Sequence, residues 1–71
     1  MKLIEAILSG KPFRRPSWVT QDDEFQWVII NHNDGYFDWA ENTGEPSGNV
    51  FGSLEQIVQQ NGEVEDYEIK P

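Results

Sequence analysis

Two stretches rich in β-branched and aromatic residues, joined by a short polar turn, constrain the fold of this chain most. Residues 25–30, Phe-Gln-Trp-Val-Ile-Ile, have the composition of a buried strand. Residues 32–35, His-Asn-Asp-Gly, end in an Asp-Gly pair that supplies the positive φ a tight hairpin needs. Residues 36–40, Tyr-Phe-Asp-Trp-Ala, return as the partner strand. The sequence therefore predicts an antiparallel β-hairpin over residues 25–40.

Two short helices and a last strand are predicted outside the hairpin. Apolar residues at i,i+4 spacing form one stripe of a helix over residues 3–8, which Gly10 ends. Residues 53–56, Ser-Leu-Glu-Gln, match the capping box that opens a second helix, and the Asn-Gly pair at 61–62 ends it. Residues 67–69, Tyr-Glu-Ile, alternate between polar and apolar and are interpreted as the last strand.

The segments between these elements are interpreted as an arm and a loop. Residues 11–18 contain two prolines, each of which disfavours the helical region for the residue before it. We therefore expect a short edge strand or extended arm there, with Phe13 pointing inward. Residues 41–49 have the composition of a loop, and a long one for so small a domain. The element order predicts an α+β fold, a small antiparallel sheet with an N-terminal helix and a short C-terminal helix before the last strand.

Chain size predicts one domain over residues 1–71 and favours self-association. A chain of 71 residues cannot hold two separate cores. The absence of cysteine excludes a disulfide framework and thiolate metal sites, and it fits a reducing compartment. Small domains without such staples often oligomerise, so we expect a homo-oligomer. No stretch resembles a signal peptide or a membrane span, which favours a cytoplasmic protein without membrane association.

The charges are divided unevenly along the chain. Residues 1–20 carry a net +3 and residues 21–71 a net −11, which together give the overall −8. A field of this sign repels nucleic acids and anionic membranes, so general nucleic-acid binding is not expected. Two options remain. One is a local basic pocket for a small anionic ligand, and the other is an acidic surface that docks on a basic protein site as a DNA mimic would.

Patterns for catalysis or metal binding are sparse. His32 lies in a turn, has no cysteine partner, and is interpreted as a solvated histidine. The sequence contains neither a Gly-x-Ser-x-Gly elbow nor a phosphate-cradling glycine loop. The acidic residues 22–24 are read as a solvated turn, because adjacent side chains diverge and no glycine follows at the EF-hand spacing. We therefore expect no enzymatic activity, no cofactor and no metal.

Three residues of the arm have the chemistry of nucleotide recognition. The guanidinium groups of Arg14 and Arg15 suit phosphate oxygens, and the indole of Trp18 offers a face on which a base can stack. The alternative is that both arginines only pair with the surplus carboxylates of the chain.

A second candidate cluster lies in the hairpin. If Phe37 and Trp39 face the core, then Tyr36 and Asp38 face the opposite side of the sheet. Asp38 would then accept hydrogen bonds from a ribose hydroxyl or a base amino group, Tyr36 would stack on the base, and Trp39 would complete the pocket. The alternative is a plain sheet surface or a subunit interface.

The arm and the C-terminal part resemble a known family. Residues 10–18, Gly-Lys-Pro-Phe-Arg-Arg-Pro-Ser-Trp, resemble the Gly-Lys-x-hydrophobic-Arg-Arg-x-x-Trp opening of the small phage proteins called Thoeris anti-defence 2-like. Residues 54–58 and 66–69 resemble that family's leucine- and isoleucine-bearing helix and its Asp-aromatic-Glu-hydrophobic strand. The chain departs from the pattern where residues 61–65 lengthen the link before the last strand, and where Tyr67 stands in place of the usual tryptophan.

The resemblance implies an oligomeric phage sponge of α+β fold. Such a protein binds a nucleotide-derived immune signal, a cyclic ADP-ribose isomer or a cyclic dinucleotide, between subunits and holds it without cleaving it. Arg14, Arg15 and Trp18 occupy the matching positions, whereas the hairpin cluster is inferred from its chemistry alone. Two alternatives stay open: an acidic inhibitor that binds a host protein directly, and an assembly module whose aromatic face is only an interface.

Overall fold

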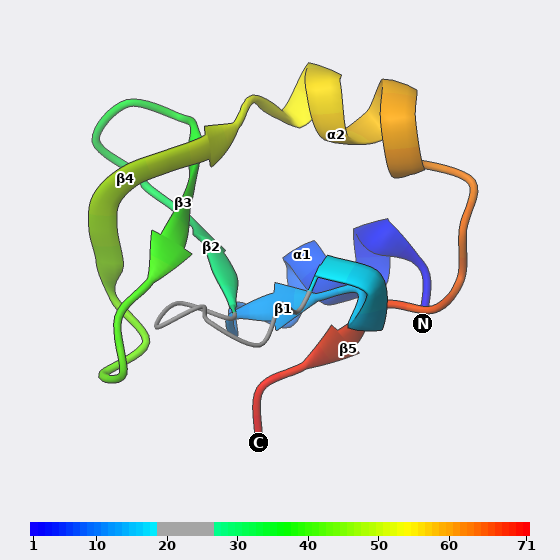
Figure 1. Ribbon diagram of the computed structural model, residues 1–71, viewed down its shortest axis with the longest axis horizontal. Helices are drawn as coiled ribbons and strands as arrows, with labels where there is room; N and C mark the ends of the chain where they lie inside the picture. The colour runs from blue at the N-terminus through cyan, green and yellow to red at the C-terminus, as the bar shows by residue number, and fades with distance from the viewer. Residues whose placement is uncertain (19–26) are drawn as a thin grey trace.

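The computed structural model of this chain describes residues 1–18 and 27–71 and shows a five-stranded antiparallel sheet with two helices (Figure 1). In space the strands follow the order β4-β3-β2-β1-β5. In chain order the elements are α1 (Leu3–Leu8), β1 (Phe13–Arg14), the 3-10 helix η1 (Pro16–Trp18), β2 (Val28–Ile30), β3 (Phe37–Ala40), β4 (Pro46–Gly52), α2 (Leu54–Asn61) and β5 (Glu68–Ile69). The predicted α+β class, with one helix at the N-terminus and another before the last strand, is confirmed.

The core lies where both helices meet the sheet. Its buried members come from α1, α2, three strands and the segment before β5: Leu3, Ala6, Phe13, Val28, Phe37, Ile57 and Tyr67. Phe13 is central, because its ring makes edge-on contacts with Phe37 at 5.7 Å and with Tyr67 at 6.0 Å between centroids. The expectation that Phe13 points inward is confirmed, since only 2% of this residue is exposed.

Local sequence rules account for the turn and for the start of α2. Gly35 adopts a φ of 76°, and the backbone N–H of Asn31 donates to the Tyr36 carbonyl at 2.7 Å to close the β2–β3 hairpin. The capping box is formed, because the Gln56 N–H donates to Ser53 Oγ at 3.2 Å and the Ser53 N–H donates to Gln56 Oε1 at 2.9 Å. The hairpin is thus confirmed over residues 28–40, whereas predicted strand residues 25–26 and the acidic turn 22–24 lie outside the described residues.

Residues 13–14 of the arm form the interior strand β1, and residues 16–18 form η1, which corrects the prediction of an edge strand or extended arm. Phe13 pairs with Val28 of β2 on one side and with Ile69 of β5 on the other. The Lys70 N–H also donates to the Pro12 carbonyl at 2.8 Å, which extends this pairing. Because β5 covers the outer side of β1, Phe13 has a register partner on both sides.

The predicted loop 41–49 is wrong in its second half, because residues 46–49 belong to β4. Asp38 pairs with Val50 and Ala40 pairs with Pro46, so residues 47–49 bulge opposite the single residue between Asp38 and Ala40. Gly48 occupies the bulge with a φ of 90°, a conformation that favours glycine. Glycine and proline, which indicate a loop by composition, here shape an irregular strand instead.

Candidate functional site

The Arg14 guanidinium is held within the sheet by an acidic neighbour. Arg14 and Glu68 are register partners on β1 and β5, and Arg14 Nε donates to Glu68 Oε1 at 2.6 Å. The guanidinium carbon also lies 3.9 Å from the centroid of the Trp27 ring, a cation–π contact. Arg14 therefore ties three strand segments together, and a phosphate group would have to compete with this arrangement.

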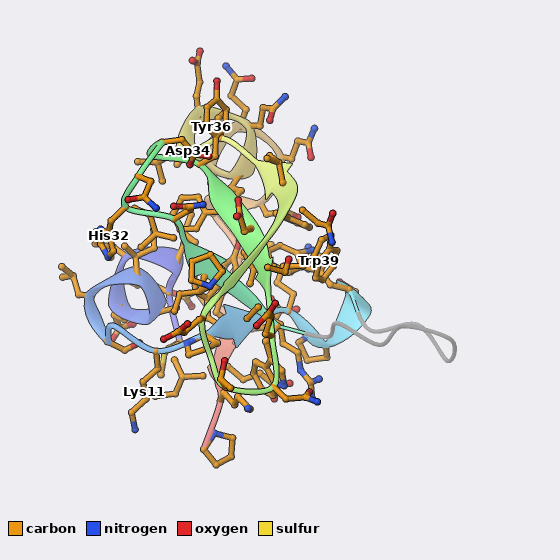
Figure 2. The ribbon with its side chains drawn as sticks, turned by 90° about the vertical axis from the view of Figure 1, so that its left-hand side faces the viewer. Lys11, His32, Asp34, Tyr36 and Trp39 are labelled. Carbon is orange, nitrogen blue, oxygen red and sulfur yellow. The ribbon has the colours of Figure 1, made fainter. Side chains whose placement is uncertain are left out.

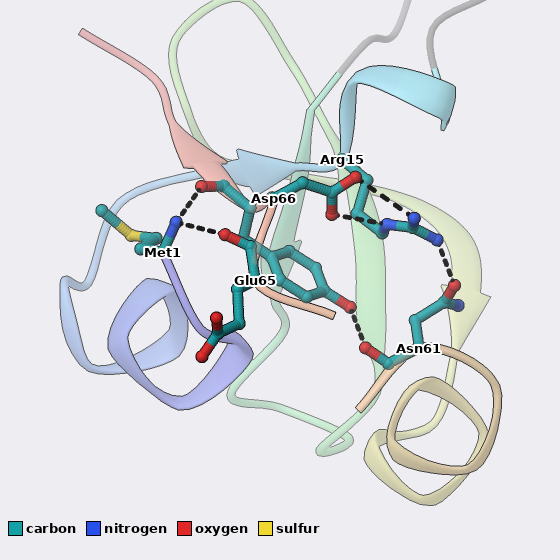
Figure 3. Close-up of polar contacts among 6 residues, drawn as sticks. Met1, Arg15, Asn61, Glu65 and Asp66 are labelled. Carbon is teal, nitrogen blue, oxygen red and sulfur yellow. Dashed lines mark hydrogen bonds and ion pairs between the residues drawn. The ribbon is translucent and has the colours of Figure 1, made fainter. Parts of the chain in front are cut away.

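Arg15 joins three separate parts of the chain (Figure 3). Its Nε and Nη2 donate to the two carboxylate oxygens of Asp66 at 2.8 and 3.2 Å, and its Nη1 donates to Asn61 Oδ1 at 2.6 Å. The Tyr67 hydroxyl donates to the Asn61 carbonyl at 3.1 Å. The bond to Asp66 raises the pKa of Arg15 and lowers that of Asp66, while burial raises the pKa of the Tyr67 hydroxyl. The network fixes the end of α2 against the residues that precede β5.

The Asp66 carboxylate should make stability depend on pH in the acid range. Its folded-state pKa is depressed, mainly by the Arg15 hydrogen bond, so it stabilises the fold above its unfolded-state pKa of about 3.9 and loses that effect as the pH falls through the folded-state value. We expect Asp66→Asn to lower the urea midpoint at pH 7 and to converge with the wild type in acid. Glu63→Gln, an exposed carboxylate change, is the matched control. A midpoint difference that stays constant down to acid pH would contradict this assignment.

Trp18 and Trp39 are brought together by a third aromatic residue that the sequence did not single out. The Phe51 ring lies between them, 4.7 Å from the Trp18 ring and 5.0 Å from the Trp39 ring by centroid. All three are partly buried and pack against the core. The contacts among the three rings cover faces and edges on which a base could otherwise stack. This aromatic group therefore extends the core.

Tyr36 and Asp38 do not share a surface. Tyr36 is 46% exposed and lies beside Asp34 at the hairpin turn, away from Trp39 (Figure 2). Asp38 is 1% exposed, and its Oδ2 accepts from Asn31 Nδ2 at 3.0 Å and from the Gly48 N–H at 3.2 Å. The prediction that Asp38 accepts hydrogen bonds from a ligand does not fit this burial, because the bulge of β4 brings the backbone of Gly48 over its carboxylate. Asp38 therefore holds β4 in place and offers no oxygen to solvent.

A hollow of about 310 Å³ opens on the side of the molecule that carries α1. It lies between the C-terminal end of α1, the end of β2 and the turn that leads into β4. The lining is mostly apolar and consists of Ile7, Gly10, Lys11, Phe13, Ile29, Ile30, His32, Phe37, Gly44, Glu45 and Pro46. Figure 2 places Lys11 and His32 on this side, opposite Trp39. Its volume is at the lower end of the range for pockets that take small organic ligands.

Lys11 differs from the other cations of the chain. Lys2, Arg14 and Arg15 lie within ion-pair distance of Glu65, Glu68 and Asp66, and Lys70 Nζ donates to a backbone carbonyl. Within residues 1–18 and 27–71, the Lys11 ammonium has neither a hydrogen bond nor an ion pair. It is exposed at the edge of the apolar hollow, with His32 and Glu45 as the other ionisable lining residues. Sequence reasoning named Lys11 as part of the basic arm but did not separate it from the arginines, because pairing is a long-range property.

Comparison with known proteins does not assign this chain to a family. No protein family, curated protein or solved structure matches it. The resemblance to the Thoeris anti-defence 2-like proteins therefore stays a prediction, as does the absence of enzymatic activity. In the described part of the chain no group of three His, Asp or Glu side chains could hold a metal ion. Neither described helix is long and apolar enough to span a bilayer.

Proposed function

We propose that this protein binds a small anionic ligand with a flat apolar body and sequesters it unchanged. The ligand class indicated by the sequence resemblance is a nucleotide-derived cyclic signal, either a cyclic ADP-ribose isomer or a cyclic dinucleotide. One observation carries the proposal: Lys11, without an acidic partner among the described residues, stands at the rim of the apolar hollow. In a chain with 13 acidic and 5 basic residues, a cation that has no partner among the described residues and stands beside an apolar pocket is where a small anion would be attracted.

The apolar lining of the hollow and the charged residues at its rim contact different parts of the ligand. Apolar side chains such as Ile7, Phe13 and Phe37 receive the flat body of a base, because burying its faces removes apolar surface from water. The Lys11 ammonium contacts the phosphate, and Glu45 is placed to accept from an exocyclic amino group. Arg14 and Arg15, held by the chain's own carboxylates, position the strand that follows Lys11.

A pocket of this size takes only part of a cyclic dinucleotide. Sequestration at an affinity near 1 nM requires about 12 kcal/mol of binding free energy, which one base and one ion pair do not supply. We therefore propose that the site is completed by a second copy of the chain, in line with the oligomer expected from chain size. This arrangement also accounts for a functional site in a cysteine-free domain of only 71 residues.

Calorimetric titration tests the ligand part of the proposal. The wild-type protein is titrated with a panel of cyclic dinucleotides and cyclic ADP-ribose isomers, and the bound compound is then recovered and weighed by mass spectrometry. We expect at least one compound to bind and to be recovered unchanged. Lys11→Ala should weaken that binding by about 10–100-fold, because a charge-assisted hydrogen bond contributes about 1.5–3 kcal/mol.

Lys70→Ala is the matched control, since it removes the same charge from a residue that does not line the hollow. No heat from any compound would reject the ligand proposal. Equal weakening by both lysine variants would reject Lys11 as the contact. Recovery of an altered compound would show an enzyme. A host protein captured by the wild type in place of any ligand would favour the alternative of an acidic inhibitor.

A further inference from the structure

An apolar groove of about 340 Å³ runs between the two helices. Residues of both helices and their ends line it: Lys2, Leu3, Ile4, Ile7, Leu54, Val58 and Gly62. Large apolar side chains along it are open to water, with exposed fractions of 57% for Ile4, 47% for Leu54 and 49% for Val58. Leu8 extends this face and is 78% exposed. An apolar surface of this kind on so small a domain indicates an interface.

The helix α1 shows why this face lacks a cover within the chain. Leu3 and Ala6 point into the core, while Ile4 and Leu8, one turn apart, point outward. A helix that is apolar on opposite sides is typical of a buried helix, not of a surface helix. On α2, Leu54 and Val58 form a second outward pair at the same spacing beside the buried Ile57. Ile4 from α1 and the Leu54–Val58 pair from α2 therefore line the groove, and Leu8 lies on α1 outside its lining.

The charge of the groove, compared with that of the whole chain, indicates which kind of partner can bind there. Of the residues that line the groove, Lys2 alone is charged, and its ammonium lies 3.8 Å from Glu65 Oε1. The groove lining and this ion partner thus carry no net charge together, whereas the whole chain carries −8. Two copies of the chain repel each other over most of their surfaces but hardly at all here. A strongly basic partner, in contrast, would be attracted to other parts of the molecule.

We propose that a second copy of this chain docks on the α1–α2 groove. In a two-fold arrangement, Ile4 and Leu8 of one copy enter the groove of the other, and the reverse contact forms at the same time. A standard interface takes about 800 Å² from each partner, which is about a sixth of the 4775 Å² of accessible surface of the chain.

The groove and the ligand hollow share a wall. Ile7 lines both of them. A second copy that covers the outer side of α1 would therefore also fix the helix that bounds the ligand hollow. The inference rests on the oligomer part of the proposed function and names its surface. It needs no ligand to be tested.

Sedimentation equilibrium on the full chain without ligand tests this inference. We expect the wild type to shift with concentration from the monomer mass of 8.2 kDa to twice that value, and to associate more tightly at high salt, where repulsion between acidic surfaces is screened. Leu8→Glu should stay monomeric over the same range and keep the wild-type far-UV circular dichroism, because its side chain is exposed in the single chain. Val50→Glu, the same charge change at a 55% exposed apolar residue of β4, should dimerise like the wild type.

A wild type that stays monomeric throughout would overturn the inference. So would an assembly that Leu8→Glu leaves intact, or one that Val50→Glu disrupts equally. Titration of the wild type and of the monomeric Leu8→Glu protein with the same compounds then separates the two proposals. Dimers that bind no compound reject only the ligand part. Ligand binding by a monomeric wild type rejects the interface and the completion of the site by a second copy, and leaves the Lys11 contact standing.

Discussion

Replacing Phe13 by alanine is expected to lower the free energy of unfolding by about 3–5 kcal/mol, the range measured for buried phenylalanines. Phe13 is 2% exposed and lies at the centre of the core, in edge-on contact with Phe37 and Tyr67. A domain of this length has a total stability of about 4–11 kcal/mol, from about 0.05–0.15 kcal/mol per residue. The substitution therefore removes a large share of the stability.

The same substitution should affect the ligand hollow. Phe13 belongs both to the core and to the lining of the hollow, so its loss opens the floor of the pocket into the space between the sheet and α1. Phe13→Leu keeps most of the apolar volume and should cost less than the alanine variant. The two variants separate the effect of a cavity from the effect of the missing ring.

Urea unfolding followed by tryptophan fluorescence measures these effects. Tyr36→Ala is the matched control, because it deletes an aromatic side chain that is 46% exposed at the hairpin turn. We expect this control to change the free energy of unfolding by less than about 0.5 kcal/mol. A Phe13→Ala protein within about 1 kcal/mol of the wild type would show that the core does not depend on this ring.

Elements set by neighbouring residues were predictable from the sequence. The hairpin turn follows from Gly35 and the start of α2 follows from the Ser53 capping box, because both depend on contacts within a few residues. The location of the arm was not predictable in this way. Whether β1 is an edge or an interior strand depends on pairing with Ile69, which is 56 residues away along the chain. No local pattern reports such a partner.

The candidate site, too, was only partly predictable from the sequence. Composition alone offered the alternative that the arginines pair with surplus carboxylates, and the structure shows such pairs for Arg14 and Arg15. It could not name the partners, Glu68 and Asp66, because the final strand brings them back to the arm. Lys11 differs because the other four cations each have a partner, whereas the Lys11 ammonium has none among the described residues.

Asp38 shows how a contact with another strand changes the role expected of a residue from its own strand. Alternation along β3 predicted an outward carboxylate, but the bulge of β4 places the Gly48 N–H over it. The same strand begins at Pro46, which lines the ligand hollow together with Glu45. Through its bond to Gly48, Asp38 therefore acts on the wall of the pocket from inside the fold. It is a positioning residue for β4.

Replacing Asp38 by alanine is expected to lower the free energy of unfolding by about 3 kcal/mol. Two donors, Asn31 Nδ2 and the Gly48 N–H, lose the carboxylate that accepts from them, and hydrogen bonds to charged groups contribute about 1.5–3 kcal/mol each. Asn31 is only half-buried and can turn toward water, so the cost falls mainly on the backbone of β4. Amide exchange at Gly48 should accelerate more than exchange in β2.

Asp38→Asn separates the hydrogen bonds from the charge. The asparagine keeps one oxygen for both donors and removes a buried negative charge whose Oδ1 has no hydrogen-bond partner among the described residues. We expect this variant to lie within about 1 kcal/mol of the wild type, because the lost charge assistance and the relieved desolvation oppose each other. Asp34→Ala, which removes an exposed carboxylate that accepts from the Tyr36 N–H at 2.9 Å, is the control. If asparagine proves as damaging as alanine, then the charge of Asp38, and not its two hydrogen bonds, holds β4 in place.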